Sequence, residues 1–216
     1  MASRTGADES RSSTTTVTLL IARWSCGSVF VPPTTSAFVG VVRQVRRQAP
    51  DCQIELLTPD FQGHEMPLAK VIAERPDVFN HNCEVVPRLY PVARRGSEFL
   101  RSARVLKNAK EMGGDEVVTK SGLMVGLGET HEEMVETFGI LREHHVQVLT
   151  VGQYLRPTER HLPIVRYWHP DEFKALEDAA YALGFDHIAA GPLVRSSYHA
   201  DQHVPQDRPG VGPLAA

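Results

Sequence analysis

Cysteine is scarce in this sequence of 216 residues, which contains three. Cys26, Cys52 and Cys83 lie far apart along the chain. An odd number of distant cysteines excludes a disulfide framework and a Cys-x-x-Cys metal pair, and it favours a reducing compartment. Each cysteine on its own is best interpreted as a small buried hydrophobic residue.

Long apolar runs and an excess of positive charge are also missing. The most apolar stretch, TVTLLIARW, is too short for a membrane helix and is interrupted by Arg23. A net charge of −3 gives no electrostatic reason to expect nucleic-acid binding. The opening MASRTGADESRSSTTT is as rich in Ser, Thr and Arg as a transit peptide, but its acidic residues argue against that interpretation. We expect residues 1–36 to be poorly specified or disordered and residues 201–216 to be a flexible tail.

The remainder of the chain alternates between strand-like and helix-like patterns. Thr130, with Glu133 three residues later, is a capping-box signature for the start of one helix. Alternation of this kind predicts a parallel sheet covered by helices, either doubly wound or part of a (β/α) barrel. The predicted strands are 53–61, 78–86, 117–127, 146–154 and 185–191, and the predicted helices are 37–50, 67–76, 96–114, 130–145 and 170–184.

Polar residues follow these strands in the segments PDFQG, HNCE, GLGE, GQYLRP and GPLVRSSY. The carboxyl ends of parallel strands meet at one edge, where barrel enzymes carry their chemistry. The sequence therefore predicts a site on that edge. We expect the edge to include the following residues: Asn82, Glu84, Gly126, Glu129, Gln153 and Ser197.

The segment GLMVGLGETHEE breaks an apolar run with Gly126 and Gly128 and then introduces Glu129. Glycine at the end of a strand marks a bend or a close approach by another backbone or by a ligand. Glu129 is either a ligand group beside that opening or a first-turn charge that favours the helix dipole.

Several segments together resemble one family, the lipoyl synthases of the radical S-adenosylmethionine superfamily. They are PDFQG, RPDVFNHNCEVVPRLY, TKSGLMVGLGETHEE, LTVGQYLRPT, HLPIVRY and GPLVRSSYHA, and they extend over residues 37–201. The resemblance implies an α/β fold for residues 37–200, namely an incomplete (β/α) barrel of the radical SAM type with parallel strands and outer helices.

The resemblance also implies residue roles. GLMVGLGE is similar to the family's GxIxGxxE element, which lies along the S-adenosylmethionine site, and this assigns Gly122, Gly126, Gly128 and Glu129 to cofactor binding. Glycines suit such a site because a side chain would keep the backbone from the cofactor.

NHNCEVVP resembles an Asn-x-Glu-Thr segment, which implies that Asn82 and Glu84 also face the cofactor. Alternate strand residues share a face, so this spacing allows both to reach one ligand. A pair that forms hydrogen bonds at the strand end is the alternative. The chain departs from the family pattern at Cys83 and Val85. In VRSSYHA the resemblance makes Ser197 a ligand to an iron of an auxiliary cluster, whereas in isolation it would be a loop serine.

The family's reaction inserts two sulfur atoms at C6 and C8 of an octanoyl group on a lipoyl carrier domain or H protein. It requires S-adenosylmethionine, two 4Fe-4S clusters and an electron donor such as ferredoxin or flavodoxin. The resemblance implies no nucleic-acid or membrane partner, and a cytoplasmic location, or a mitochondrial or plastid one in a eukaryote.

One requirement of that chemistry is missing, because the sequence has no Cys-x3-Cys-x2-Cys motif and no second three-cysteine motif. The resemblance also fades upstream of residue 37. We therefore expect a chain of lipoyl synthase ancestry whose N-terminal part is lost or replaced and which is inactive alone. One alternative is a non-catalytic, barrel-derived protein that binds S-adenosylmethionine or a carrier domain. Another, a (β/α) enzyme acting on a phosphorylated substrate, is disfavoured because GLGET lacks the GK[ST] of a phosphate loop.

Overall fold

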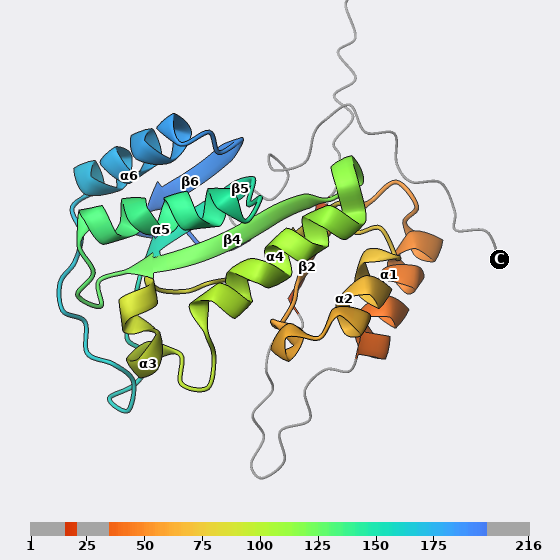
Figure 1. Ribbon diagram of the computed structural model, residues 1–216, viewed down its shortest axis with the longest axis horizontal. Coiled ribbons are helices and arrows are strands. Elements are labelled where there is room, and N and C mark those ends of the chain that lie inside the picture. The colour runs from red at the N-terminus through yellow and green to blue at the C-terminus, as the bar shows by residue number, and fades with distance from the viewer. Residues whose placement is uncertain (1–15, 21–34, 198–216) are drawn as a thin grey trace, which may run out of the picture.

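The computed structural model describes residues 16–20 and 35–197, which form one sheet with helices packed against it (Figure 1). The strands are β1 (Thr16–Leu20), β2 (Gln53–Leu57), β3 (Val78–Asn80), β4 (Val118–Val125), β5 (Val148–Gln153) and β6 (His187–Gly191). The helices are α1 (Thr35–Gln48), α2 (Glu65–Ile72), α3 (Tyr90–Ala93), α4 (Phe99–Gly113), α5 (His131–Glu143) and α6 (Pro170–Ala182).

The sheet has six strands in the order β1-β2-β3-β4-β5-β6, and every neighbouring pair is parallel. Helices connect consecutive strands and pack on one another, α1 against α2, α2 against α4 and α5 against α6. Within the described residues the sheet stays open, with β1 and β6 at its edges. The predicted α/β architecture is confirmed: the described residues form an incomplete (β/α) barrel of parallel strands with helices outside.

Local signals explain where α5 and α6 begin. The Thr130 hydroxyl accepts a hydrogen bond from the Glu133 amide, and the Glu133 carboxylate accepts one from the Thr130 amide, which is the predicted capping box. At α6, Pro170 occupies the first turn, where its missing N–H costs nothing. Gly184 follows this helix with a φ of 85°, a conformation that glycine adopts readily.

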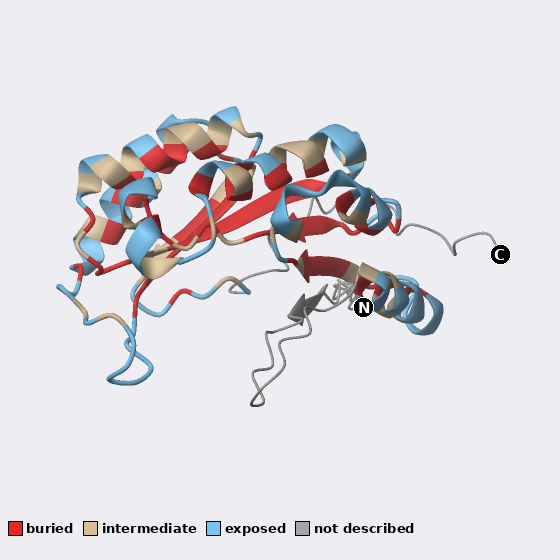
Figure 2. Ribbon diagram, turned by 60° about the horizontal axis from the view of Figure 1, so that its bottom comes forward, coloured by how far each residue is buried: buried red, intermediate tan, exposed pale blue. Residues whose placement is uncertain are grey.

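The main core lies between the helices and the sheet (Figure 2). The buried apolar helix residues there are Phe38 and Val42, then Phe99, Ala103, Leu106 and Ala109, then Met134, Phe138 and Leu141, then Phe173, Leu176 and Ala180. Leu183, one residue beyond the end of α6, is exposed.

Two segments differ from the predictions. The strand expected over 78–86 ends at Asn80, and Glu84 instead adopts a left-handed φ of 69° and makes an isolated bridge to Leu123 of β4. Residues 16–20 lie in the segment expected to lack regular structure, yet they form β1 beside β2. The run TVTLL is too short for a membrane but long enough, and rich enough in β-branched residues, for a strand. No helix in the described part of the chain is long and apolar enough to cross a membrane.

The face of the sheet opposite the main core is built in layers, because alternate residues of each strand share a face. Val78, Val118 and Val148 form a small buried cluster on it. Two residues further along these strands come Asn80, Lys120 and Thr150, all buried. The layers therefore change from apolar to polar toward the carboxyl ends of the strands.

A buried ion pair joins two strands across this polar layer. Lys120 Nζ of β4 lies 2.9 and 3.0 Å from the two carboxylate oxygens of Glu55 in β2, and neither side chain is exposed to solvent. Asn80 of β3, between them, donates a hydrogen bond of 2.8 Å to Glu55. Burial lowers the pKa of Lys120, and the nearby Glu55 carboxylate opposes that shift.

We predict that Lys120→Met lowers the free energy of unfolding by about 3–5 kcal/mol, because it leaves the Glu55 carboxylate buried without its cation. The double variant Glu55→Leu/Lys120→Met removes both charges and is expected to lose much less. Urea unfolding of the wild type, both single variants and the double variant measures the coupling. Losses that simply add in the double variant would contradict this account.

Candidate functional site

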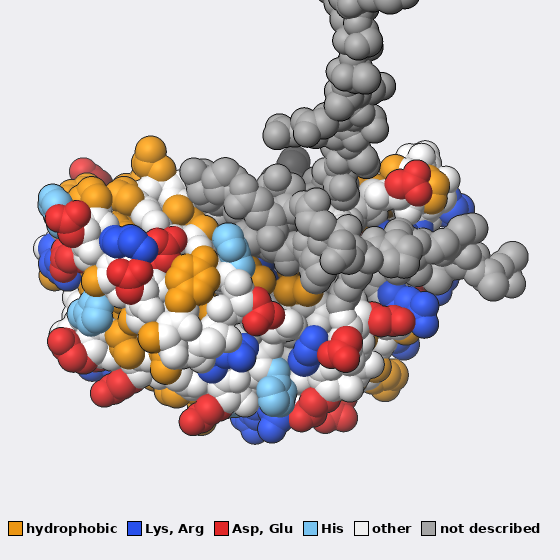
Figure 3. Space-filling model, turned by 90° about the horizontal axis from the view of Figure 1, so that it is seen from above, with side chains coloured by type: hydrophobic (Ala, Val, Ile, Leu, Met, Phe, Trp, Pro, Cys, Tyr) orange, Lys and Arg blue, Asp and Glu red, His pale blue; other side chains and the backbone are white. Residues whose placement is uncertain are grey.

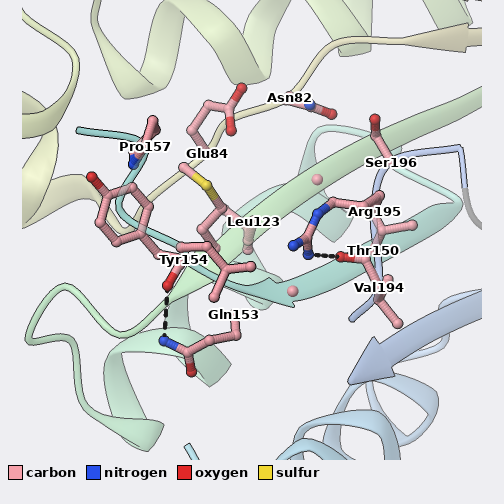
Figure 4. A pocket seen from close by; sticks show the side chains of 14 residues that line it. Asn82, Glu84, Leu123, Thr150, Gln153, Tyr154, Pro157, Val194, Arg195 and Ser196 are labelled. Atoms are coloured by element: carbon pink, nitrogen blue, oxygen red, sulfur yellow. Dashed lines mark hydrogen bonds between the residues drawn. The ribbon is translucent and has the colours of Figure 1, made fainter. Parts of the chain in front are cut away.

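A cavity of about 380 Å³ opens at the carboxyl ends of β4 and β5 (Figure 4). In that view Asn82, Thr150, Arg195 and Ser196 gather on one side, with Glu84, Tyr154 and Pro157 on the other. Three segments that follow β3, β5 and β6 therefore meet around one space. The lining residues are Asn82, Glu84, Gly122, Leu123, Met124, Thr150, Gly152, Gln153, Tyr154, Leu155, Pro157, Val194, Arg195 and Ser196.

At Gly122, side chains from two other segments approach the backbone of β4 closely. A Cβ at this position would lie 2.7 Å from the side-chain oxygen of Asn82 and 3.0 Å from the hydroxyl of Thr150. Glycine therefore allows an amide from the segment after β3 and a hydroxyl from β5 to converge over β4. The Asn82 oxygen is buried and accepts no hydrogen bond from any described residue. An unpaired buried acceptor is costly in a folded protein unless a ligand or water satisfies it.

Gly152 has a matching role on β5. A Cβ there would collide with the carbonyl oxygen of Val194, from the turn that follows β6. The Val194 amide donates to the Gly191 carbonyl, and Arg195 donates to the Val194 carbonyl at 2.7 Å. The chain after β6 is thus folded back across β5, which brings the Arg195 side chain to the cavity.

Glu84 is held at the cavity by its backbone. Its amide donates to Gly122 at 2.9 Å, and its carbonyl accepts from Met124 at 2.7 Å. Arg94 approaches its carboxylate at 3.4 Å. Burial raises the pKa of Glu84, while the charge of Arg94 and a hydrogen bond from Asn82 act in the opposite direction. The result is a carboxylate beside the cavity with one nearby cation.

Glu129 points into its own loop rather than into the cavity. Its carboxylate accepts hydrogen bonds from the amides of Gly126, at 2.5 Å, and Leu127, at 3.0 Å, and the residue is 4% exposed. Gly126 and Gly128 have φ values of 109° and 102°, which side chains other than glycine rarely adopt. Glu129 therefore fixes the turn between β4 and α5.

Gln153 fixes the long segment between β5 and α6 against that turn. Its amide nitrogen donates to the carbonyls of Tyr154 and Arg166, both at 3.2 Å, and its oxygen accepts from the Trp168 amide at 3.0 Å. A Cβ on Gly126 would collide with the Gln153 side chain and approach the Arg166 carbonyl at 2.8 Å. The close approach predicted at Gly126 is thus made by this chain's own loop.

Of the six residues predicted for one edge, Gln153 ends β5 and the other five follow strands, so all six lie at the carboxyl side of the parallel sheet. Asn82, Glu84 and Gly122 line the cavity, whereas Gly126, Gly128 and Glu129 do not. Ser197 is exposed and outside the lining, and its neighbour Ser196 lies in it. The assigned binding roles of these residues stay predictions.

Several residues that line the cavity were not predicted from the sequence: Thr150, Gly152, Tyr154 and Arg195. Gly152 had a usable signal, because a glycine inside a strand often marks a close backbone approach. Thr150 carried no such signal, since a threonine in a buried strand is ordinary.

The described cysteines do not suit an iron–sulfur cluster. Cys52 and Cys83 are buried, and burial raises the pKa of Cys83 to about 12, so that its thiol stays protonated. Cluster ligands are thiolates that converge on one cage. Nowhere in the described ranges do three or more His, Cys, Asp or Glu side chains gather as metal ligands would. Cys26 lies outside the described residues.

His81 is buried beside the site, on the segment that carries Asn82. One ring nitrogen, Nδ1, lies 2.8 Å from the Thr58 carbonyl, and the other is buried with no partner among the described residues. Burial lowers the pKa of His81 to about 4, although the bond to Thr58 opposes the shift. The imidazole is therefore neutral at neutral pH, with Nδ1 donating to Thr58.

Comparison with known proteins identifies relatives. The chain is 52% identical to the lipoyl synthase of Rubrobacter xylanophilus over 176 residues, which is 82% of this chain and 54% of that protein. It is 54% identical to the lipoyl synthases of Burkholderia mallei and Burkholderia pseudomallei over 165 residues, 76% of this chain and 50% of theirs. The chain thus spans about half the length of the curated relatives it matches. No protein-family model matches it.

Among solved structures, methylornithine synthase has a similar fold, with a TM-score of 0.53 over 81% of this chain and 58% of that chain. The two sequences are 14% identical, so this likeness concerns the fold alone.

We predict that the neutral, buried His81 makes stability depend on pH. Because its pKa is about 4 in the native state and near 6.5 when unfolded, the unfolded chain binds the extra proton between these values. The contribution of His81 is complete above about pH 6.5, and about 3 kcal/mol of it is lost as the pH falls toward 4. Urea unfolding at several pH values should show a smaller decline for His81→Gln than for the wild type. The exposed His64→Gln serves as the control, and equal declines in all three proteins would contradict the prediction.

Proposed function

We propose that this chain, a homologue of lipoyl synthases over 82% of its length, binds S-adenosylmethionine in the cavity at the carboxyl ends of β4 and β5. One observation carries the proposal: the Asn82 side-chain oxygen is buried and unpaired over Gly122, in a space that a Cβ would fill. Such an acceptor suits a hydroxyl or amino hydrogen of a nucleoside-like ligand.

Several neighbouring groups support this assignment. Gly122 leaves the backbone of β4 open to a ligand, and the Thr150 hydroxyl of the neighbouring strand β5 lies 3.0 Å from the position that a Gly122 Cβ would take. Glu84 offers a carboxylate to a positively charged part of the ligand, with Arg94 as its present partner. The cavity volume is within the range typical of small-molecule sites. In this proposal Gly126, Gly128 and Glu129 act indirectly, by fixing the turn beside the cavity.

We do not extend the proposal to the whole family reaction by this chain alone. Insertion of sulfur at C6 and C8 of an octanoyl group depends on cluster-driven radical chemistry, and the described thiols do not fit a cluster. An octanoylated carrier domain or H protein, an electron donor and a cytoplasmic location belong to that whole reaction and stay predictions. Ser197, the predicted iron ligand, is exposed and has no thiolate partner within the described residues.

The second candidate is a protein that binds S-adenosylmethionine without cleaving it. The cavity lining favours this candidate, because the described residues that line it include no cysteine or histidine. A catalytic chain and a non-catalytic chain would both bind S-adenosylmethionine. Only the catalytic chain would cleave it, so cleavage separates the two candidates.

For binding, we predict that isothermal titration detects S-adenosylmethionine binding to the wild-type chain and that Gly122→Ala weakens it by about tenfold or more. The added methyl group would press on the Asn82 oxygen and the Thr150 hydroxyl and occupy the cavity. The matched control is Gly139→Ala in α5, where a Cβ meets nothing within 4 Å. Equal affinity of Gly122→Ala and the wild type would refute the location of the site.

For cleavage, we predict that anaerobic reconstitution with iron and sulfide leaves the chain without a stable four-iron cluster. A cluster needs about three or four converging thiolates, whereas the sequence has three cysteines and two of them are buried apart from any metal-ligand group. Iron analysis and visible spectroscopy give the result. Iron near four atoms per chain, with 5′-deoxyadenosine formed on reduction, would instead favour catalysis.

A further inference from the structure

Two charged residues line the cavity, and they lie on different sides of it. Glu84 comes from the segment after β3, and Arg195 comes from the segment after β6. In Figure 4 Arg195 lies with Thr150 and Ser196, whereas Glu84 lies with Tyr154 on the other side. The other described lining residues are uncharged. The lining is therefore dipolar, with one negative and one positive side.

The negative side is already balanced within the protein, whereas the positive side is not. Arg94 approaches the Glu84 carboxylate at 3.4 Å, and Asn82 donates a hydrogen bond to it. The Arg195 guanidinium donates to the Val194 carbonyl at 2.7 Å and forms no ion pair with any described carboxylate. A guanidinium has five N–H donors, so most of those on Arg195 remain for a ligand.

The place of Arg195, rather than its exposure, distinguishes it from other arginines. Arg47 and Arg156 are also exposed and form no ion pair with a described carboxylate, but neither lines the cavity. On the side of the molecule seen in Figure 3, acidic and basic side chains are interspersed over the described surface. Arg195 therefore places an unbalanced positive charge at the cavity.

The turn after β6 positions Arg195 before any ligand binds. Val194 is 8% exposed, and its amide donates to the Gly191 carbonyl, which closes the turn. A Cβ on Gly152 would collide with the Val194 carbonyl and lie 3.4 Å from a guanidinium nitrogen of Arg195. The guanidinium thus lies close to the backbone of β5. A side chain that is already positioned loses less conformational freedom when a ligand binds.

The lining favours a carboxylate over a phosphate as the partner of this arginine. A guanidinium matches a planar carboxylate through two parallel hydrogen bonds. Phosphate sites usually combine several donors, such as the amides of a helix N-terminus and a lysine. The described lining residues include one arginine and no lysine, and none of them belongs to a helix.

We infer that Arg195 binds the carboxylate of a nucleoside that carries an amino-acid group, with the positively charged part of the same ligand toward Glu84. This inference rests on the proposed function for the identity of the ligand. It goes beyond that function by assigning Arg195 and by fixing the direction in which the ligand lies. A ligand without the carboxylate would cover the guanidinium and leave it unpaired, which costs binding free energy. The cavity therefore discriminates between ligands by their carboxylate.

The test compares S-adenosylmethionine with decarboxylated S-adenosylmethionine, which lacks only the carboxylate, by isothermal titration. We expect the wild type to bind S-adenosylmethionine about tenfold or more tightly than the decarboxylated form. Arg195→Met should weaken binding of S-adenosylmethionine by about tenfold or more. It should leave the decarboxylated form within about threefold of the wild type, or bind it more tightly, because repulsion between two cations is removed. Arg195→Lys should lie between the wild type and Arg195→Met, since lysine keeps the charge and loses the planar pair of donors.

Two further variants show whether the effect is specific to the carboxylate. Glu84→Gln should weaken both ligands, because both keep their positive charges. Arg47→Met, at an exposed arginine near the end of α1, should change neither affinity, and urea unfolding confirms that each variant is folded. A merely structural role of Arg195 would affect both ligands alike. Equal weakening of the two ligands by Arg195→Met, or unchanged binding of S-adenosylmethionine, would therefore overturn the inference.

The remaining outcomes separate this inference from the proposed function. If the wild type binds neither ligand, the proposed function fails and the inference fails with it. If S-adenosylmethionine binds and Gly122→Ala weakens it, while Arg195→Met affects both ligands alike, the proposed function stands and the inference fails alone. Tighter binding of 5′-AMP than of S-adenosylmethionine, lost in Arg195→Met, would assign the arginine to a phosphate and overturn the inference.

Discussion

The parallel register of β3, β4 and β5 is the constraint on which the site depends. It aligns Val78 with Val118 and Asn80 with Lys120, and it sets Gly122 beside Thr150. Because side chains alternate between faces, one face carries apolar, then polar, then glycine positions toward the carboxyl ends. A shift of one residue in any strand would exchange these positions with those of the main core and abolish the cavity.

The polar layer beneath the cavity is stable only as a unit. Glu55, Asn80 and Lys120 come from three adjacent strands, and each is fully buried. Such a network forms only when the three strands are in register, and it is costly when one charge is left buried without the other. It therefore favours this register over alternatives and supplies a rigid base for Asn82 and Gly122 above it.

Glycines serve two different purposes at this edge. Gly122 opens space in the cavity and Gly152 admits the Val194 carbonyl beside it, whereas Gly126 and Gly128 let the chain turn and let the segment after β5 cross it. The segment between β5 and α6 is thereby held against the turn that follows β4.

Short-range patterns in the sequence determined the helices, most of the strands and the edge on which the site lies. Helical periodicity and the capping box at Thr130 act within a few residues, so they can be recognised without the fold. Parallel pairing then places every loop after a strand at one edge, which is why Asn82, Glu84 and Gln153 could be predicted there. Only the tertiary structure decided that Glu129 bonds its own loop, that Ser196 and not Ser197 reaches the cavity, and that Arg195 is folded across Gly152. These outcomes depend on contacts between segments distant in sequence, such as the Val194 carbonyl over β5, and no local pattern encodes such distances.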